Sequence, residues 1–211
     1  MLREGSLAAE QVHNPASGGG SIPTPSLHSL IVSECQVSEI QPIIEREHYS
    51  HSIFGVTTDV CFKVTVGDRI VGGSIFGKPA GAGVLAKYSE DGKYKTLECR
   101  RYILTDDCPK NSESKTLAYM LRQLKKKGYQ RVLSYADPAH GHRGLIYQAT
   151  GFRYVGKTAK RKHVMWKGKK YPDRNIHQVH FPFHLELRAA LADGSATRVQ
   201  IPGKNIYVRD L

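Results

Sequence analysis

The sequence lacks any apolar run long enough to cross a membrane. Its first residues, MLREGSLAAEQ, contain no apolar segment of the kind that a secretory signal needs. No other run approaches the roughly 20 apolar residues of a membrane-spanning helix. We therefore expect no membrane partner and a place in the cytoplasm.

Cysteine is also scarce, and its spacing excludes the common zinc-binding patterns. The four cysteines are Cys35, Cys61, Cys99 and Cys108, and no two of them form a CxxC pair. Two of them lie in the strand-like segments DVCFKV and LECRRY. This usage predicts buried thiols in a reducing compartment rather than metal ligands or disulfides.

Acidic residues are few beside the basic ones. The chain has 31 Lys and Arg against 19 Asp and Glu, a net charge of +12. Such a surplus indicates a polyanionic partner, which is usually nucleic acid and less often a membrane surface. A basic protein without such a partner is the alternative.

The positive charge is concentrated after the middle of the chain. Residues 153–174 hold nine Lys or Arg and one acidic residue, with Trp166 and Tyr171 among them. This mixture suits phosphate contacts and base stacking, and the alternative is a solvated basic edge strand. We favour nucleic acid as the partner. The residues expected to contact it are Lys160, Arg161, Lys162, Lys167, Lys169, Lys170 and Arg174.

Hydrophobic residues make up 40% of the 211 residues, which is enough for one domain of ordinary size with an appendage. Residues 14–26, NPASGGGSIPTPS, have the composition of a linker. We expect an N-terminal arm and linker over residues 1–28, a catalytic core over 29–168, and a C-terminal extension that contacts DNA over 169–211.

The periodicity of the core alternates between strands and helices. A strand is predicted near 29–35, a helix in VSEIQPIIEREHY that Ser38 could cap, and a hairpin that turns at Gly67-Asp68. A strong strand follows in KTLECRRYILTDD. The first half of the core therefore predicts an antiparallel sheet with a helix packed on it.

The second half continues the alternation. SESKTLAYMLRQLKKKG predicts a helix capped by Ser112 or Ser114, and YQRVLSYAD predicts a buried strand. HRGLIYQATGF predicts a short helix, and RYVGKT with KHVMWKG a closing strand pair. The order predicts an α/β fold with a mixed, mostly antiparallel sheet flanked by helices and a basic C-terminal extension.

The order strand, GLIYQATGF, strand resembles the fold of GCN5-related N-acetyltransferases. In that family a helix that carries a tyrosine and finishes in Gly-Phe follows the strand beside the acyl donor. Tyr147 matches this tyrosine, and the resemblance implies that it acts as a general acid or positions the donor. The family's glycine-rich turn, which holds the coenzyme A pyrophosphate, is replaced here by DDCPKNSESKT.

This departure affects the donor. The resemblance implies a small-molecule donor of the acyl type, and acetyl-coenzyme A is one candidate, although the turn is not its usual cradle. At the start of the helix, Asn111, Ser112 and Ser114 could still bind an anionic or carbonyl group of the donor. Capping of the helix is the alternative role of these side chains.

Four segments together are similar to the Mom family of Mu-like phages. They are EREHYSHSIFG, ECRRYIL, CPKNSES and SYADPAHGHRGLIYQATGF. The resemblance implies an enzyme that adds an acetamido-type (carbamoylmethyl) group to adenine N6 in phage DNA. The modification would block restriction in the bacterial host, whose cytoplasm is the implied location. The resemblance assigns no donor, and a homodimer is left open.

Four candidate catalytic residues accompany Tyr147. His48 and Tyr49 follow the first helix, where a histidine could act as a general base or position the substrate. Arg101 lies on the strand in ECRRYIL and needs an anionic partner, which could be a DNA phosphate, the donor or Asp137. Asp137 ends a strand, where it could orient His48, bind the adenine amine, or only cap the turn.

His140 and His142 form an HxH pair that could bind iron or another metal together with His48 and Asp137. A third ligand is not defined by the spacing, so we favour loop or DNA contacts for the pair. Two other function classes remain as alternatives, a GCN5-like N-acetyltransferase acting on a protein or small amine and a non-enzymatic DNA-binding module. The missing glycine-rich turn disfavours the first, and the second leaves Tyr147 and Asp137 without a shared task.

Overall fold

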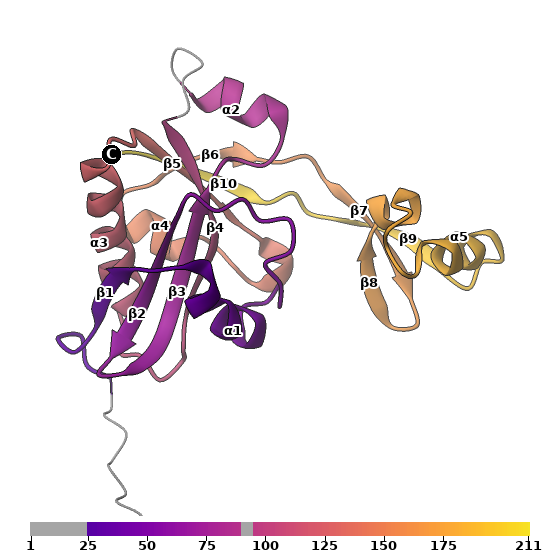
Figure 1. Ribbon diagram of the computed structural model, residues 1–211. Coiled ribbons are helices and arrows are strands. Elements are labelled where there is room, and N and C mark those ends of the chain that lie inside the picture. Colours follow the sequence, from indigo (N-terminus) through magenta and orange to yellow (C-terminus); the bar gives the residue numbers. More distant parts are fainter. Residues whose placement is uncertain (1–24, 90–94) are drawn as a thin grey trace, which may run out of the picture.

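The computed structural model describes residues 25–89 and 95–211. The N-terminal arm and most of the predicted linker lie outside the described residues. The described chain forms a large mixed α/β unit and a smaller lobe that projects from one end of it (Figure 1). Among the described residues, no helix has the length and apolarity needed to cross a bilayer.

A seven-stranded sheet in the order β1-β2-β3-β4-β5-β10-β6 forms the large unit. Neighbouring strands are antiparallel except for β4 and β5, which are parallel. The mixed, mostly antiparallel sheet is therefore confirmed. The strands are β1 (Ile31–Glu34), β2 (Val60–Val66), β3 (Arg69–Gly77), β4 (Thr96–Leu104), β5 (Arg131–Ala136), β6 (Arg153–Lys157) and β10 (Asn205–Asp210).

The two longest helices cover opposite faces of this sheet. Helix α1 (Val37–Glu47) buries Ile40 and Ile44 against Cys61 of β2, and α3 (Ser112–Lys126) packs on the face that carries Phe62. Side chains alternate between the faces of a strand, so neighbouring positions on β2 serve different helices. Helix α2 (Ala82–Tyr88), which we did not predict, follows β3.

The helix starts differ from the predicted caps. At α1 the cap residue is Gln36, whose backbone N–H donates to Glu39 at 2.9 Å, so the helix begins two residues earlier than a Ser38 cap would place it. At α3 the cap position belongs to Asn111, in a left-handed conformation (φ 71°), without a side-chain capping bond. The predicted hairpin is confirmed, because β2 ends at Val66 and β3 begins at Arg69.

The parallel pair β4 and β5 separates soon after it forms. Its ladder joins Thr96–Glu98 to Arg131–Leu133, whereas β4 continues to Leu104 and β5 to Ala136. The 3-10 helix η2 (Pro138–His140) and helix α4 (Leu145–Ala149) then follow β5. The parting of the two strands opens the middle of the sheet at the carboxyl end of β5, where ligands bind in many α/β proteins.

The smaller lobe, residues 161–201, has a sheet and a core of its own. Its sheet has the order β8-β7-β9, and its core contains Val164, Ile176 and Leu187. The prediction that RYVGKT and KHVMWKG pair is wrong, because β6 and β7 belong to different sheets. The elements are β7 (Arg161–Trp166), β8 (Lys169–Pro172), η3 (Asp173–His177), α5 (His184–Ala192) and β9 (Thr197–Ile201).

The lobe is an insertion between two strands of the large sheet. The chain leaves after β6 and returns as β10, which lies between β5 and β6 (Figure 1). The predicted extension over 169–211 therefore has different limits in the structure, since its last strand is part of the central sheet. Two chain segments, 158–160 and 202–204, connect the lobe to the large unit, and we refer to them as the neck.

Candidate functional site

A cavity of about 520 Å³ lies where β4 and β5 part. Its walls come from β4, the end of β5, the end of α1 and the η2–α4 segment. This volume is in the usual range for small-molecule sites, roughly 300–1,000 Å³. The cavity brings together four of the predicted catalytic residues, which are His48, Tyr49, Arg101 and Tyr147.

Tyr147 on α4 is packed between aromatic rings. Its ring centroid lies 5.4 Å from that of Phe152 and 5.5 Å from that of Tyr207. Burial raises the pKa of Tyr147 well above its ordinary value, with the neighbouring Cys99 adding to the rise. The phenol is therefore protonated at neutral pH and can donate a hydrogen bond or a proton into the cavity.

His48, just after α1, is buried with 6% of its surface exposed. The Ser50 backbone N–H donates to His48 Nδ1 at 3.1 Å. A backbone N–H can only donate, so Nδ1 is the acceptor and the proton of the neutral ring lies on Nε2. Burial, together with the Arg101 cation, lowers the pKa of His48 to about 4. His48 is thus a neutral donor through Nε2, which disfavours the general-base role.

Tyr49 lies at the centre of a cluster of rings. Its centroid is 4.3 Å from that of His48, 4.5 Å from that of His140 and 5.2 Å from that of His142. Within residues 25–89 and 95–211, no group of three or more His, Cys, Asp or Glu side chains is arranged to hold a metal ion. His140 ends η2 and His142 lines the cavity, and both rings lie against Tyr49.

Arg101 and Arg100 take different partners, as strand alternation predicts. The Arg101 Nε donates to the Ser52 carbonyl at 3.0 Å, and its Nη1 donates to the Arg100 carbonyl at 2.7 Å. Arg100 instead pairs with Glu98 at 3.4 Å. Asp137 is not the partner of Arg101, contrary to one of our alternatives. Among the described residues, Arg101 has no carboxylate within 4 Å, so it presents a half-buried positive charge to the cavity.

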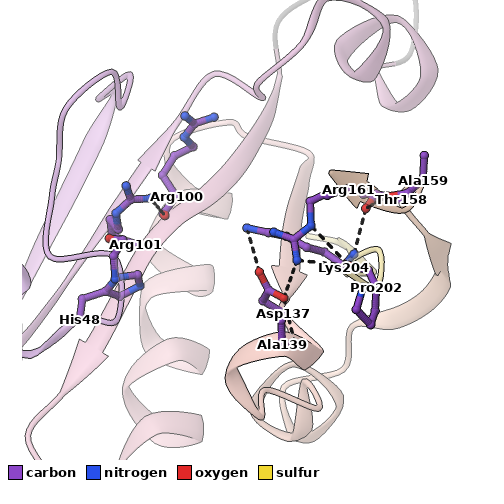
Figure 2. A network of polar contacts seen from close by, with 11 residues as sticks. His48, Arg100, Arg101, Asp137, Ala139, Thr158, Ala159, Arg161, Pro202 and Lys204 are labelled. Carbon is purple, nitrogen blue, oxygen red and sulfur yellow. Dashed lines mark hydrogen bonds and ion pairs between the residues drawn. The ribbon is translucent and has the colours of Figure 1, made fainter. Parts of the chain in front are cut away.

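Asp137 does not contact His48. Its carboxylate is 2% exposed and receives the Ala139 N–H at 3.1 Å, which confirms its role in capping the turn. The same carboxylate pairs with Arg161 at 2.7 Å and with Lys204 at 3.7 Å (Figure 2). The hydrogen bond and charge of Arg161 outweigh the effect of burial and hold the pKa of Asp137 below its ordinary value. An ionised carboxylate with these partners is a poor proton acceptor.

The hydroxyls at the start of α3 are already used within the chain. The Ser112 hydroxyl donates to the Pro109 carbonyl at 2.6 Å, and the Ser114 hydroxyl donates to the Asn111 carbonyl at 3.1 Å. The cavity wall near this turn also includes two carboxylates, Asp106 and Glu113, which disfavour an anionic group close to them. The predicted donor contacts of Asn111, Ser112 and Ser114 stay a prediction.

The predicted DNA-binding residues divide into two groups. Lys162, Lys169 and Lys170 lie on β7 and β8 with exposed side chains, and the Lys167 ammonium sits 4.4 Å above the Trp166 ring. Arg161 differs, because its guanidinium points to the buried Asp137 rather than to solvent. Lys160 precedes β7, and Arg174 lies on η3 with its side chain exposed.

Some residues of the site were not predicted from the sequence. Lys204 lies within 4 Å of Asp137, and Arg143 and Tyr135 line the cavity. Lys204 had one local signal, the Pro202-Gly203 turn just before it. Nothing in the sequence indicated that Lys204 would lie beside Asp137 in the folded chain.

The chain is similar in fold to acetyltransferases. A GCN5-related N-acetyltransferase from Kribbella flavida has a TM-score of 0.51 and 11% identity, and the match covers 88% of this chain and 100% of that one. The IAA acetyltransferase from Bacillus cereus has a TM-score of 0.50 and 10% identity, with 87% and 100% covered. At these identities the likeness establishes the fold alone, and it confirms the acetyltransferase-like architecture.

The sequence comparisons are more specific. The Methylcarbamoylase mom of Escherichia phage Mu is 39% identical over 62 residues, an alignment that covers 28% of this chain and about a quarter (26%) of that protein. The model of the Mom protein family matches residues 29–208, which is most of the chain. This chain therefore belongs to the Mom protein family.

Proposed function

We propose that the protein is a DNA modification enzyme that transfers a carbamoylmethyl group to N6 of adenine in double-stranded DNA and so protects phage DNA from restriction. The observation that carries the proposal is the cavity between the parted strands β4 and β5, with the protonated Tyr147 and the neutral His48 in its wall. Membership of the Mom family and the resemblance to methylcarbamoylase mom support the reaction class.

Adenine N6 is a weak nucleophile, because its lone pair is conjugated with the ring. The bond from N6 to the methylene carbon of the carbamoylmethyl group forms while the bond from that carbon to the donor's leaving group breaks. Tyr147 gives its proton to the leaving group, and the proton that N6 loses restores the phenol. The His48 Nε2–H donates to the carbonyl of the transferred group, and Arg101 binds an anionic oxygen of the donor or of the DNA.

The target adenine must leave the duplex to reach this cavity. N6 is paired inside the double helix, and enzymes that act on a base extrude the nucleotide into a pocket. The ring cluster around Tyr49 at the cavity offers faces on which such a base stacks. The basic lobe, with eight Lys or Arg and three Asp or Glu in residues 161–201, supplies contacts to the backbone of the DNA.

The test is expression in bacteria, followed by digestion of the plasmid DNA to nucleosides and mass spectrometry. We expect a deoxyadenosine that carries the added mass of one carbamoylmethyl group. Unmodified DNA from cells with abundant folded protein would refute the proposal. Acetylated protein or amine in place of modified DNA would instead support the acetyltransferase alternative.

Tyr147→Phe tests the role of the phenol within this proposal. Removing a general acid costs roughly 10²–10⁴-fold in rate, so we expect the modified fraction to fall at least 100-fold on a time course. The matched control is Tyr154→Phe, since Tyr154 is 52% exposed on β6 and outside the cavity. Equal modification by both variants would exclude Tyr147 as the acid.

A further inference from the structure

Asp137 joins the two parts of the molecule. It ends β5 of the central sheet, and both of its charged partners lie at the base of the lobe (Figure 2). Arg161 is the first residue of the lobe sheet, and Lys204 is the last residue before the chain re-enters the central sheet. One buried carboxylate thus contacts the chain where it enters the lobe and where it leaves it.

The neck itself is tightly packed. The Lys204 N–H donates to Thr158 Oγ1 at 2.9 Å, and the Thr158 N–H donates to the Lys204 carbonyl at 2.9 Å. The Arg161 Nη2 also donates to the Pro202 carbonyl at 3.2 Å. A Cβ at Gly203 would lie 1.9 Å from the Thr158 carbonyl oxygen, so the outgoing and returning segments approach as closely as their backbones permit.

The contacts exclude other tasks for this carboxylate. It is almost fully buried, and its described contacts are the turn N–H of Ala139 and the cationic side chains of Arg161 and Lys204. Breaking a buried ion pair by removing one partner is strongly unfavourable, because the other charge is left without compensation. The ion pairs therefore resist any movement that would separate the neck from the end of β5.

We propose that Asp137 is a positioning residue that holds the lobe in a fixed orientation to the cavity through Arg161 and Lys204. Resting on the proposed function, this means that DNA bound by the lobe presents its extruded adenine at the cavity between β4 and β5. The sequence predicted Arg161 as a DNA contact because of its charge. In this proposal Arg161 holds the lobe in place by pairing with Asp137. Asp137 takes no proton in the reaction.

The test compares Asp137→Asn, which removes both ion pairs, with Arg161→Met, which removes only the pair to Arg161. We expect both variants to lose at least 10-fold of the modification while their affinity for duplex DNA, measured by fluorescence anisotropy, changes less than threefold. We also expect faster hydrogen exchange at the Thr158 and Lys204 amides in both. The double variant should be no worse than the more impaired single variant, since Asp137→Asn already removes the ion pair that Arg161→Met removes.

The matched control is Arg69→Met. Arg69 pairs with Asp107 at 2.7 Å, and neither residue belongs to the lobe, the neck or the cavity wall. This change removes one positive charge and one ion pair elsewhere in the molecule, and we expect it to leave modification unchanged. Full modification by Arg161→Met beside loss in Asp137→Asn would overturn the proposal, because Asp137 would then act on the substrate. Unchanged amide exchange in both variants would overturn it as well.

Misfolding of a variant and failure of the proposed function can both be told apart from failure of the anchor. If Asp137→Asn does not fold, Arg161→Met and Lys204→Met carry the same test from the other side of the ion pairs. If the wild-type protein leaves DNA unmodified, the proposed function fails, whereas the amide exchange still reports whether Asp137 anchors the lobe.

Discussion

At the level of single residues, the cavity wall brings the hydrogen-bond donors His48 and Tyr147 together with the Arg101 cation. His48 is neutral because burial and the nearby Arg101 disfavour its charged form, and Ser50 leaves the proton on Nε2. Tyr147 keeps its proton because it is enclosed by other side chains. A wall of donors suits a reaction in which negative charge develops on the transferred group or on the leaving group.

The depressed pKa of His48 predicts how stability depends on pH. The unfolded chain binds a proton on this residue below about pH 6.5, whereas the folded protein does so only below about pH 4. The unfolded state therefore binds more protons between these values, and stability falls as the pH is lowered from 6.5 towards 4. After allowance for solvent screening, we expect His48 to contribute on the order of 2 kcal/mol to this fall.

The measurement is the free energy of unfolding in denaturant at several pH values. In His48→Gln the decline between pH 6.5 and 4 should be shallower than in the wild type. His180→Gln is the control, because His180 is exposed in the lobe. Identical pH curves for the wild type and His48→Gln would contradict the neutral, buried imidazole.

At the scale of elements, the short turn before α4 sets the position of Tyr147. Gly144 precedes the helix in a left-handed conformation (φ 78°), and a Cβ there would lie 2.3 Å from the Tyr207 ring. The Tyr207 hydroxyl donates to the Arg143 carbonyl at 2.7 Å. Tyr207 belongs to strand β10, so β10 holds the turn before α4 in place through this side chain.

Gly144→Ala should disturb this arrangement in two ways. The left-handed backbone costs about 1–2 kcal/mol for a residue with a Cβ, and the contact with Tyr207 forces the ring or the turn to move. We expect the free energy of unfolding to fall by about 2 kcal/mol or more, and modification to fall because Tyr147 is displaced.

The same substitution at Gly83 is the control, and we expect it to have no effect on stability or to raise it. Gly83 lies in the first turn of α2, and a Cβ there meets nothing within 4 Å. Alanine is favoured over glycine inside a helix by roughly 0.5–1 kcal/mol, so in the first turn we expect no loss and at most a gain of that size. Thermal unfolding should therefore show a lower melting temperature for Gly144→Ala and an equal or higher one for Gly83→Ala.

At the scale of the whole molecule, charge and chemistry are separated. The cavity lies in the central sheet, while the lobe carries exposed lysines on β7 and β8. Figure 1 shows that the lobe projects away from that sheet. The lobe sheet buries its own small core, so its outer surface is available to a partner. Such a separation lets the lobe hold the phosphate backbone without occupying the cavity.

Lys169 and Lys170 test this division of labour. Changing both to Gln should weaken duplex binding and reduce the slope of log K against log salt by about 0.9 for each lysine that contacts a phosphate. The measurement is a titration by fluorescence anisotropy over a range of salt concentrations. Modification should fall with binding and recover when the DNA concentration is raised.

A second lysine pair gives the control for charge. Lys125 and Lys126 are exposed at the end of α3, which lies on the side of the central sheet away from the lobe (Figure 1). Changing both to Gln removes the same charge from the molecule. An equal loss of affinity for the two pairs would show that net charge, and not the lobe, governs DNA binding.

Most local elements, and the family, could be predicted from the sequence alone. Amphipathic periodicity marked α1 and α3, Gly67-Asp68 marked a hairpin, and GLIYQATGF marked the short helix that carries Tyr147. These features depend on residues that are close along the chain, where propensity, capping and turn geometry act directly. The same is true of the net charge, which needs only composition.

The tertiary structure alone decided the roles inside the site. The pairing of Asp137 with Arg161 and Lys204, and the return of β10 between β5 and β6, join segments that are far apart in the sequence. Local patterns carry no information about which distant charges meet in a buried place, because burial and ion pairing are properties of the packed chain. For that reason Asp137, which the sequence predicted as a catalytic residue, pairs in the folded molecule with two cations where the lobe joins the central sheet.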